Sequence, residues 1–144
     1  MTRLAQLAAV AGAIAVAGAI AVVVACRNPI AGGDRVAAGT WGGTSIRLEV
    51  TAQGATIEYD CAHGTIDEPL VTDRDGRFTL AGTHVREHGG PIRQDEQPDR
   101  HPARYQGQLT GDTLRLTVML TDLQQNVGTF TLMRGVTGRV FKCL

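Results

Sequence analysis

Hydrophobic and polar residues alternate along most of the chain after residue 38. Ile46, Leu48 and Val50 alternate with polar residues, and after a short turn the same period continues from Ala55 to Cys61. This alternation is typical of β-strands that bury one face. Further strands are expected at residues 39–41, 78–80, 105–109, 114–120, 130–132 and 139–143.

Turn-forming residues separate these segments. Asp75-Gly76 ends a stretch, residues 73–76, that predicts a hairpin turn, because glycine readily adopts the positive φ that short turns need. About eight short strands joined mostly by tight turns predict an all-β fold, a small antiparallel eight-stranded meander barrel, with a β-sandwich as the alternative. The inward positions carry Ile, Leu, Val, Phe and Tyr, which favours a filled interior over a hollow one.

The N-terminal segment has a different character. Residues 7–25 are apolar and uncharged, and Arg3 is the only charged residue before them. Val23-Val24-Ala25-Cys26 resembles a bacterial lipobox, which implies that residues 1–26 are a lipoprotein signal segment and that Cys26 is lipidated. The alternative is an uncleaved anchor helix, since the run is long enough to span a bilayer. Both place the domain outside the cytoplasm and on a membrane.

The remaining chain divides into two parts. Residues 27–38 contain a proline and two glycines without periodicity, so we expect a flexible tether before a barrel domain at residues 39–144. With Cys26 assigned to a lipid, the two other cysteines are Cys61 and Cys143. An oxidising compartment favours a disulfide between them.

One expected connection, residues 86–102, is long and polar and contains three prolines. Long loops in compact domains are often functional, so a binding site is expected at the barrel end that this loop covers. The candidate binding residues are His63, His84, Arg86, His88, Arg93 and His101. His84, His88 and His101 are weak metal-ligand candidates whose spacing matches no zinc motif, so no metal and no other cofactor is predicted.

Charge and motifs narrow the function classes. The 144-residue chain has 14 basic and 14 acidic residues, so no basic excess points to a nucleic-acid partner. Phosphate-loop, dinucleotide and nucleophile-elbow patterns do not occur, which favours a non-enzymatic protein.

Two resemblances add expectations. Gly39-Thr40-Trp41 resembles the calycin signature of lipocalins, which implies that Trp41 packs near an arginine from a late strand, with Arg134 as the candidate; a plain core tryptophan is the alternative. The stretches Y-D-C-A-H-G-T-I-D-E-P-L and R-E-H-G-G-P-I-R resemble an uncharacterised family of small bacterial secreted proteins and lipoproteins. That family implies localisation and domain limits but no activity.

These features favour a lipid-anchored cell-envelope β-barrel that binds a small molecule or a partner protein. Two alternatives stay open at this point. One is a periplasmic protein inhibitor of the lysozyme type, because such inhibitors are also small β-barrel lipoproteins with a bridge to a late cysteine. The other is a histidine-based metal-binding protein or metalloenzyme.

Overall fold

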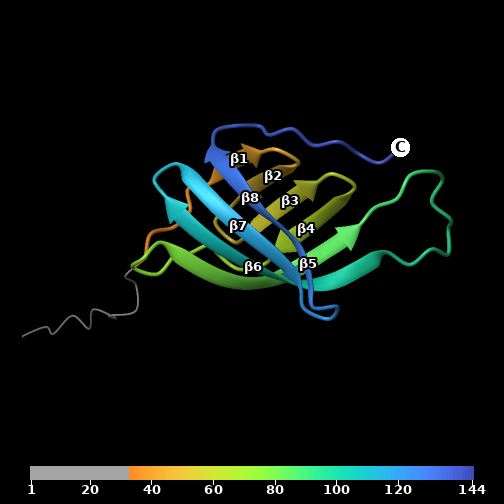
Figure 1. Ribbon diagram of the computed structural model, residues 1–144, viewed down its shortest axis with the longest axis horizontal. Helices are drawn as coiled ribbons and strands as arrows, with labels where there is room; N and C mark the ends of the chain where they lie inside the picture. The colour runs from red at the N-terminus through yellow and green to blue at the C-terminus, as the bar shows by residue number, and fades with distance from the viewer. Residues whose placement is uncertain (1–32) are drawn as a thin grey trace, which may run out of the picture.

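The chain folds into a closed antiparallel β-barrel of eight strands in sequence order, as a computed structural model describes for residues 33–144 (Figure 1). The strands are β1 (Gly39–Gly43), β2 (Ile46–Val50), β3 (Ala55–Tyr59), β4 (Ala62–Ile66), β5 (Arg77–Arg86), β6 (Asp99–Thr110), β7 (Thr113–Leu120) and β8 (Gln125–Arg134). The all-β meander barrel predicted from the sequence is therefore confirmed. The expected signal segment, Cys26 and the start of the expected tether lie outside the described residues.

Side chains fill the barrel interior. The alternating residues of β2, β3 and β7 point inward and are almost completely buried, as are Trp41 and Tyr105. Glycines make room for the largest rings: a Cβ at Gly64 would lie 2.4 Å from the Tyr105 hydroxyl, and one at Gly107 would lie 2.1 Å from the Phe78 ring. The interior is therefore occupied by closely packed side chains, as the sequence predicts.

The identity of two strands differs from the prediction. The sequence reading ended a strand at Cys61, but the chain turns at Asp60 and Cys61 and returns as β4, with Cys61 at a φ of 54°. The expected last strand, residues 139–143, is wrong. Residues 139–143 lie outside the barrel, because β1 pairs with β8 and so closes it. A single bridge joins Arg139 of this segment to Thr44.

The long connection is shorter than expected. β5 and β6 pair from Arg77↔Gln108 to Arg86↔Asp99, so the hairpin extends well past the predicted strands. The β5–β6 loop is therefore residues 87–98, and His101 belongs to β6. Residues 73–76 form a turn as predicted, but the segment before the turn is not a barrel strand.

That segment instead pairs with the start of the domain. Val36 is buried and its N–H donates a 3.0 Å hydrogen bond to the Leu70 carbonyl, while the Thr72 N–H donates to the Asp34 carbonyl at 2.9 Å. The Trp41 indole N–H donates to the Ala37 carbonyl at 2.8 Å. The segment just before β1 is thus hydrogen-bonded to the β4–β5 connection and to Trp41.

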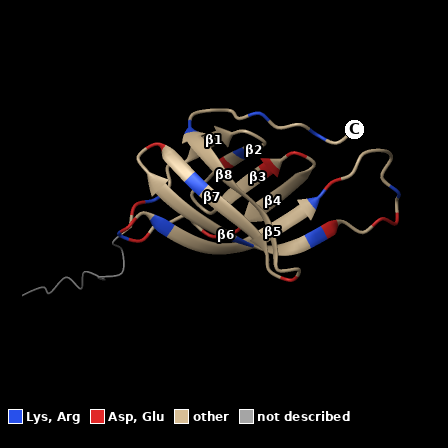
Figure 2. Cartoon of the chain, viewed as in Figure 1, with Lys and Arg blue, Asp and Glu red and all other residues tan. Residues whose placement is uncertain are grey.

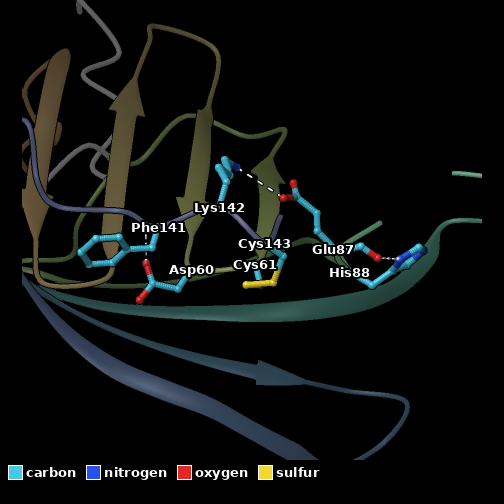
Figure 3. The surroundings of a disulfide bond; sticks show 8 residues. Asp60, Cys61, Glu87, His88, Phe141, Lys142 and Cys143 are labelled. Carbon is cyan, nitrogen blue, oxygen red and sulfur yellow. Dashed lines mark hydrogen bonds and ion pairs between the residues drawn. A yellow bond between two sulfur atoms is a disulfide. The ribbon is translucent and has the colours of Figure 1, made fainter. Parts of the chain in front are cut away.

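The C-terminal segment, residues 135–144, forms a strap outside the barrel (Figure 1). Its Arg139 exchanges hydrogen bonds with the β1–β2 turn, donating to the Gly43 carbonyl at 3.0 Å and accepting from the Ser45 N–H at 2.8 Å. Further along, Cys143 forms a disulfide with Cys61 in the β3–β4 turn, which confirms the predicted pairing (Figure 3). The strap therefore crosses two turns at the same end of the barrel.

Trp41 and Arg134 face each other in the ladder that joins β1 to β8. Trp41 is 1% exposed, whereas the Arg134 side chain is half exposed and pairs with Asp112 at 3.6 Å. The two residues are cross-strand neighbours, but the arginine head points to an exposed partner. Residues 33–144 contain no helix with the length and apolar character of a membrane span.

Candidate functional site

The four histidines gather at the barrel end that the strap crosses, which we call the strap end. Alternate connections of an up-and-down barrel lie at the same end, so the turns after β1, β3 and β7 accompany the β5–β6 loop there. His63 lies near the start of β4, His84 near the end of β5, His88 in the loop and His101 near the start of β6. Strand parity then separates them, because His84 faces inward and His63 faces outward.

A row of charges crosses the outer face at this end. Arg47, Glu58 and His63 are register neighbours on β2, β3 and β4, and Arg47 forms an ion pair with Glu58. His63 Nδ1 lies 2.6 Å from Glu87 Oε1. Glu87 Oε2 in turn lies 3.5 Å from Lys142 Nζ of the strap (Figure 3). Basic and acidic side chains therefore alternate from the barrel wall to the strap. The His63 hydrogen bond and the Lys142 charge lower the pKa of Glu87 despite its partial burial.

A row of hydroxyl groups runs beside the charges. Register pairs join Thr40, Glu49, Thr56, Thr65 and Thr83 across five strands. The Thr40 hydroxyl donates to Glu49 at 2.7 Å, and the Thr65 and Thr83 hydroxyls lie 3.0 Å apart. This row offers donors and acceptors along a rigid surface.

The two rows and the strap enclose a groove of about 480 Å³, which we call the strap groove. Thr137 and Lys142 form its strap wall, and its lining contains no Phe, Tyr or Trp. A second hollow of about 260 Å³ lies between the strand ends and the β5–β6 loop, where Ile92 lines it. His63 and Glu87 line both hollows, so this pair stands where the two meet.

Charges of both signs are interspersed over the surface, the β5–β6 loop included (Figure 2). In that loop His88 Nε2 pairs with Glu96, and His88 Nδ1 lies 2.9 Å from the Gly89 carbonyl. These contacts raise the pKa of His88. Arg93 lies in the same loop, where its carbonyl accepts a hydrogen bond from the Glu96 N–H and its side chain is exposed.

A separate polar cluster closes the barrel mouth. It comprises Tyr59, His84, Arg86, Asp99, His101, Asp122 and Gln125, and we call it the mouth cluster. His101 lies between two carboxylates, 2.7 Å from Asp122 and 2.9 Å from Asp99, and these hydrogen bonds raise its pKa. Arg86 reaches across the mouth and donates to the Gln125 side chain at 2.6 Å.

His84 is the most buried member of this cluster. It is 3% exposed, its ring centroid lies 5.0 Å from that of Tyr59, and its Nδ1 has no hydrogen-bond partner in the described part of the chain. Burial, with the nearby charges of Arg86 and His101, lowers its pKa. Below it, burial raises the pKa of Tyr105 to about 12, so its neutral hydroxyl donates to the Thr83 carbonyl at 2.6 Å.

The six candidate binding residues therefore occupy three environments. His84, Arg86 and His101 meet in the mouth cluster, His63 lies on the outer face, and His88 and Arg93 belong to the loop. Within residues 33–144 no three His, Cys, Asp or Glu side chains are grouped to hold a metal ion.

The sequence analysis did not identify several residues of the strap groove and of the mouth cluster. Arg47 and Glu58 are equidistant from the β2–β3 turn, so the hairpin register could have paired them. Lys142 precedes Cys143, so the predicted disulfide already placed it near the β3–β4 turn. Asp122 and Gln125 reach the mouth through the β7–β8 turn, and no residue pattern marks that contact.

Fold and site together define a small disulfide-bonded up-and-down β-barrel with a packed interior and its polar clusters at one end. No protein-family model matches the chain, and neither the curated proteins nor the solved structures compared with it include a match.

Proposed function

We propose that the protein is a non-enzymatic binding protein of the bacterial cell envelope, held to a membrane by a lipid on Cys26, and that its ligand occupies the strap groove. The proposal rests on one observation, namely that the groove lies outside the barrel wall and not in the barrel interior. Side chains fill the interior, whereas a groove of about 480 Å³ lies outside the wall under a covalently fixed strap. That volume is within the usual range of ligand sites.

The lining supports a polar ligand that carries charges of both signs, and a short peptide fits this description. Arg47 and Lys142 can receive carboxylates, while Glu58 and Glu87 can receive ammonium groups. The threonine hydroxyls can pair with amide N–H and C=O groups. A saccharide would lack the aromatic platform on which sugar rings commonly stack.

The position of the groove supports access from the envelope. Residues 34–36 pair with residues 70–72, in the β4–β5 connection at the end opposite the strap. The chain between Cys26 and Gly33 reaches at most about 25 Å. A lipid on Cys26 would thus keep the opposite end near the membrane and present the strap end away from it.

An NMR titration of the full chain in detergent tests the ligand class. We expect tetrapeptides with free termini to shift the amide signals of Glu58, His63 and Lys142, and chitohexaose, an uncharged saccharide, to leave them unchanged. Replacing both Arg47→Gln and Glu58→Gln should weaken peptide binding about tenfold or more, because charge-assisted hydrogen bonds are lost. Arg115→Gln on β7, which is three strands from β2 and four from β3 in the closed barrel, is the matched control. Peptides that leave the groove signals unchanged at millimolar concentration contradict the proposal.

Palmitate labelling tests the anchor. We expect radiolabelled palmitate to be incorporated into the protein expressed in bacteria, because Val23-Val24-Ala25-Cys26 resembles a lipobox. Cys26→Ala should abolish the label, whereas Cys143→Ala should retain it. Label that persists in Cys26→Ala contradicts a lipid at this position.

Inhibition of lysozyme is a second candidate function. The observation that favours it is the Cys61–Cys143 bridge in a small barrel, an architecture shared with periplasmic lysozyme inhibitors. The Ser-Gly-x-x-Tyr type of loop motif found in those inhibitors does not occur here. A lysozyme activity assay with excess protein decides, since unchanged lysis removes this candidate.

A further inference from the structure

One titratable side chain at the barrel mouth, His84, has no charge partner and no hydrogen bond at its Nδ1 atom among the residues that the structure describes. His84 extends inward from β5, is 3% exposed and packs on Tyr59, whose own ring lies 5.6 Å from that of Phe130. A neutral imidazole is compatible with this apolar packing. An imidazolium is not, because a buried charge without a partner is costly.

The charges around His84 also oppose its protonation. Across the β5–β6 ladder it faces His101, whose hydrogen bonds to Asp122 and Asp99 raise its pKa and so favour its cationic form. The other neighbours are Arg86 on β5, two residues away, and His63 on β4, both of which disfavour a second positive charge. Asp99 is the one group that favours it, and its carboxylate is shared with His101 and Arg86. From β3, Tyr59 contributes an uncharged ring.

We propose that His84 is a proton-controlled lock on the strap end: as neutral imidazole it fastens the mouth, and in mildly acidic medium the protonated ring leaves the interior and loosens β4, β5 and β6. His63 lies on β4, and the loop that begins with Glu87 joins β5 to β6, so the lock regulates the groove of the proposed function and rests on that function for its biological meaning. Its physical test does not involve the ligand.

The direction in which stability changes with pH follows from the direction of the pKa shifts. The pKa of His84 is lowered, so the unfolded or opened chain binds more protons. Its contribution to stability is complete above the unperturbed pKa of about 6.5 and is lost as the pH falls below that value. The raised pKa values of His88 and His101 act in the opposite direction, since their contributions are present at low pH and are lost as the pH rises through their folded values. Among these three histidines, only His84 can therefore cause loosening in acid.

Hydrogen exchange of the full chain in detergent at pH 7.5 and 5.5, corrected for the intrinsic exchange rate, measures this loosening. We expect amide protection in residues 62–66, 83–88 and 99–104 to fall at least tenfold at pH 5.5, while β7 stays protected. His84→Phe should keep the mouth equally protected at both pH values.

Two outcomes overturn the proposal. One is a wild-type mouth with equal protection at both pH values, and the other is His84→Phe loosening in acid as the wild type does. If His84→Phe does not fold, the His84 imidazole proton titrated by NMR in the wild type decides, since a midpoint at or above 6.5 also overturns the proposal. Peptide binding at pH 7.5 is measured separately, so failure of the lock and failure of the binding function are distinguishable.

Discussion

Removal of the Cys61–Cys143 disulfide is expected to lower the free energy of unfolding by about 4.5 kcal/mol, as chain entropy predicts for a sequence separation of 82 residues. A domain of this size is commonly stable by only about 5–15 kcal/mol. The bridge therefore supplies a large share of the total. Guanidinium denaturation of Cys61→Ala/Cys143→Ser, followed by Trp41 fluorescence, measures the loss.

A matched variant separates the bridge from the turn that contains it. Cys61 has a φ of 54°, a left-handed conformation that costs a non-glycine residue about 1–2 kcal/mol. Cys61→Gly/Cys143→Ser should therefore be about 1 kcal/mol more stable than Cys61→Ala/Cys143→Ser, although both lack the disulfide. A loss below about 1 kcal/mol in the alanine variant would show that the strap holds without the bridge.

Trp41→Ala is expected to destabilise the domain by about 3–5 kcal/mol, the range for deleting a large buried aromatic side chain. The ring is 1% exposed, and its N–H also secures the entering chain at the Ala37 carbonyl. Trp41→Phe should cost less, because it keeps most of the ring volume and loses the hydrogen bond. Since Trp41 is the only tryptophan, denaturation is followed by circular dichroism.

Arg134→Ala is the control for the calycin-like interpretation of this pair. Arg134 is opposite Trp41, but its half-exposed head pairs with Asp112, so its removal should cost less than about 1 kcal/mol. A cost for Arg134→Ala as large as that for Trp41→Phe would show that the arginine supports the tryptophan after all.

The barrel could be predicted because its strands bury one face each. Ile46, Leu48 and Val50 repeat the period of two that β7 shows again with Leu114 and Leu116, and tight turns between such segments leave a meander as the simplest topology. β4 was not predicted, because the turn before it consists of Asp60 and Cys61. Cys61 has the left-handed conformation that glycine usually adopts in such turns. The path of the strap was not predicted, because main-chain hydrogen bonds hold it to two turns and such bonds require no periodic pattern of side chains.

The location of the four histidines at one end of the barrel could be predicted, but their arrangement there could not. The end of the barrel followed from the order of strands and turns, so His63, His84, His88 and His101 were expected near one another. Which of them face inward depends on the two-residue turn before β4, so without that turn the parity of His63 relative to His84 was undetermined. The contacts of Asp122 and Lys142 arise from tertiary paths that local sequence does not encode.

The covalent link between Cys61 and Cys143 also determines how the molecule responds to mechanical force. Tension applied between the N-terminal side of the domain and the strap passes along β1, β2 and β3 and then through the sulfur atoms, so it bypasses β4 to β8. Stretching from Gly33 to Cys143 would therefore release roughly 100 Å of chain in the oxidised protein, compared with roughly 400 Å in the reduced one. A partner bound to the strap and pulled away from the N-terminal side would therefore lengthen the oxidised protein far less than the reduced one.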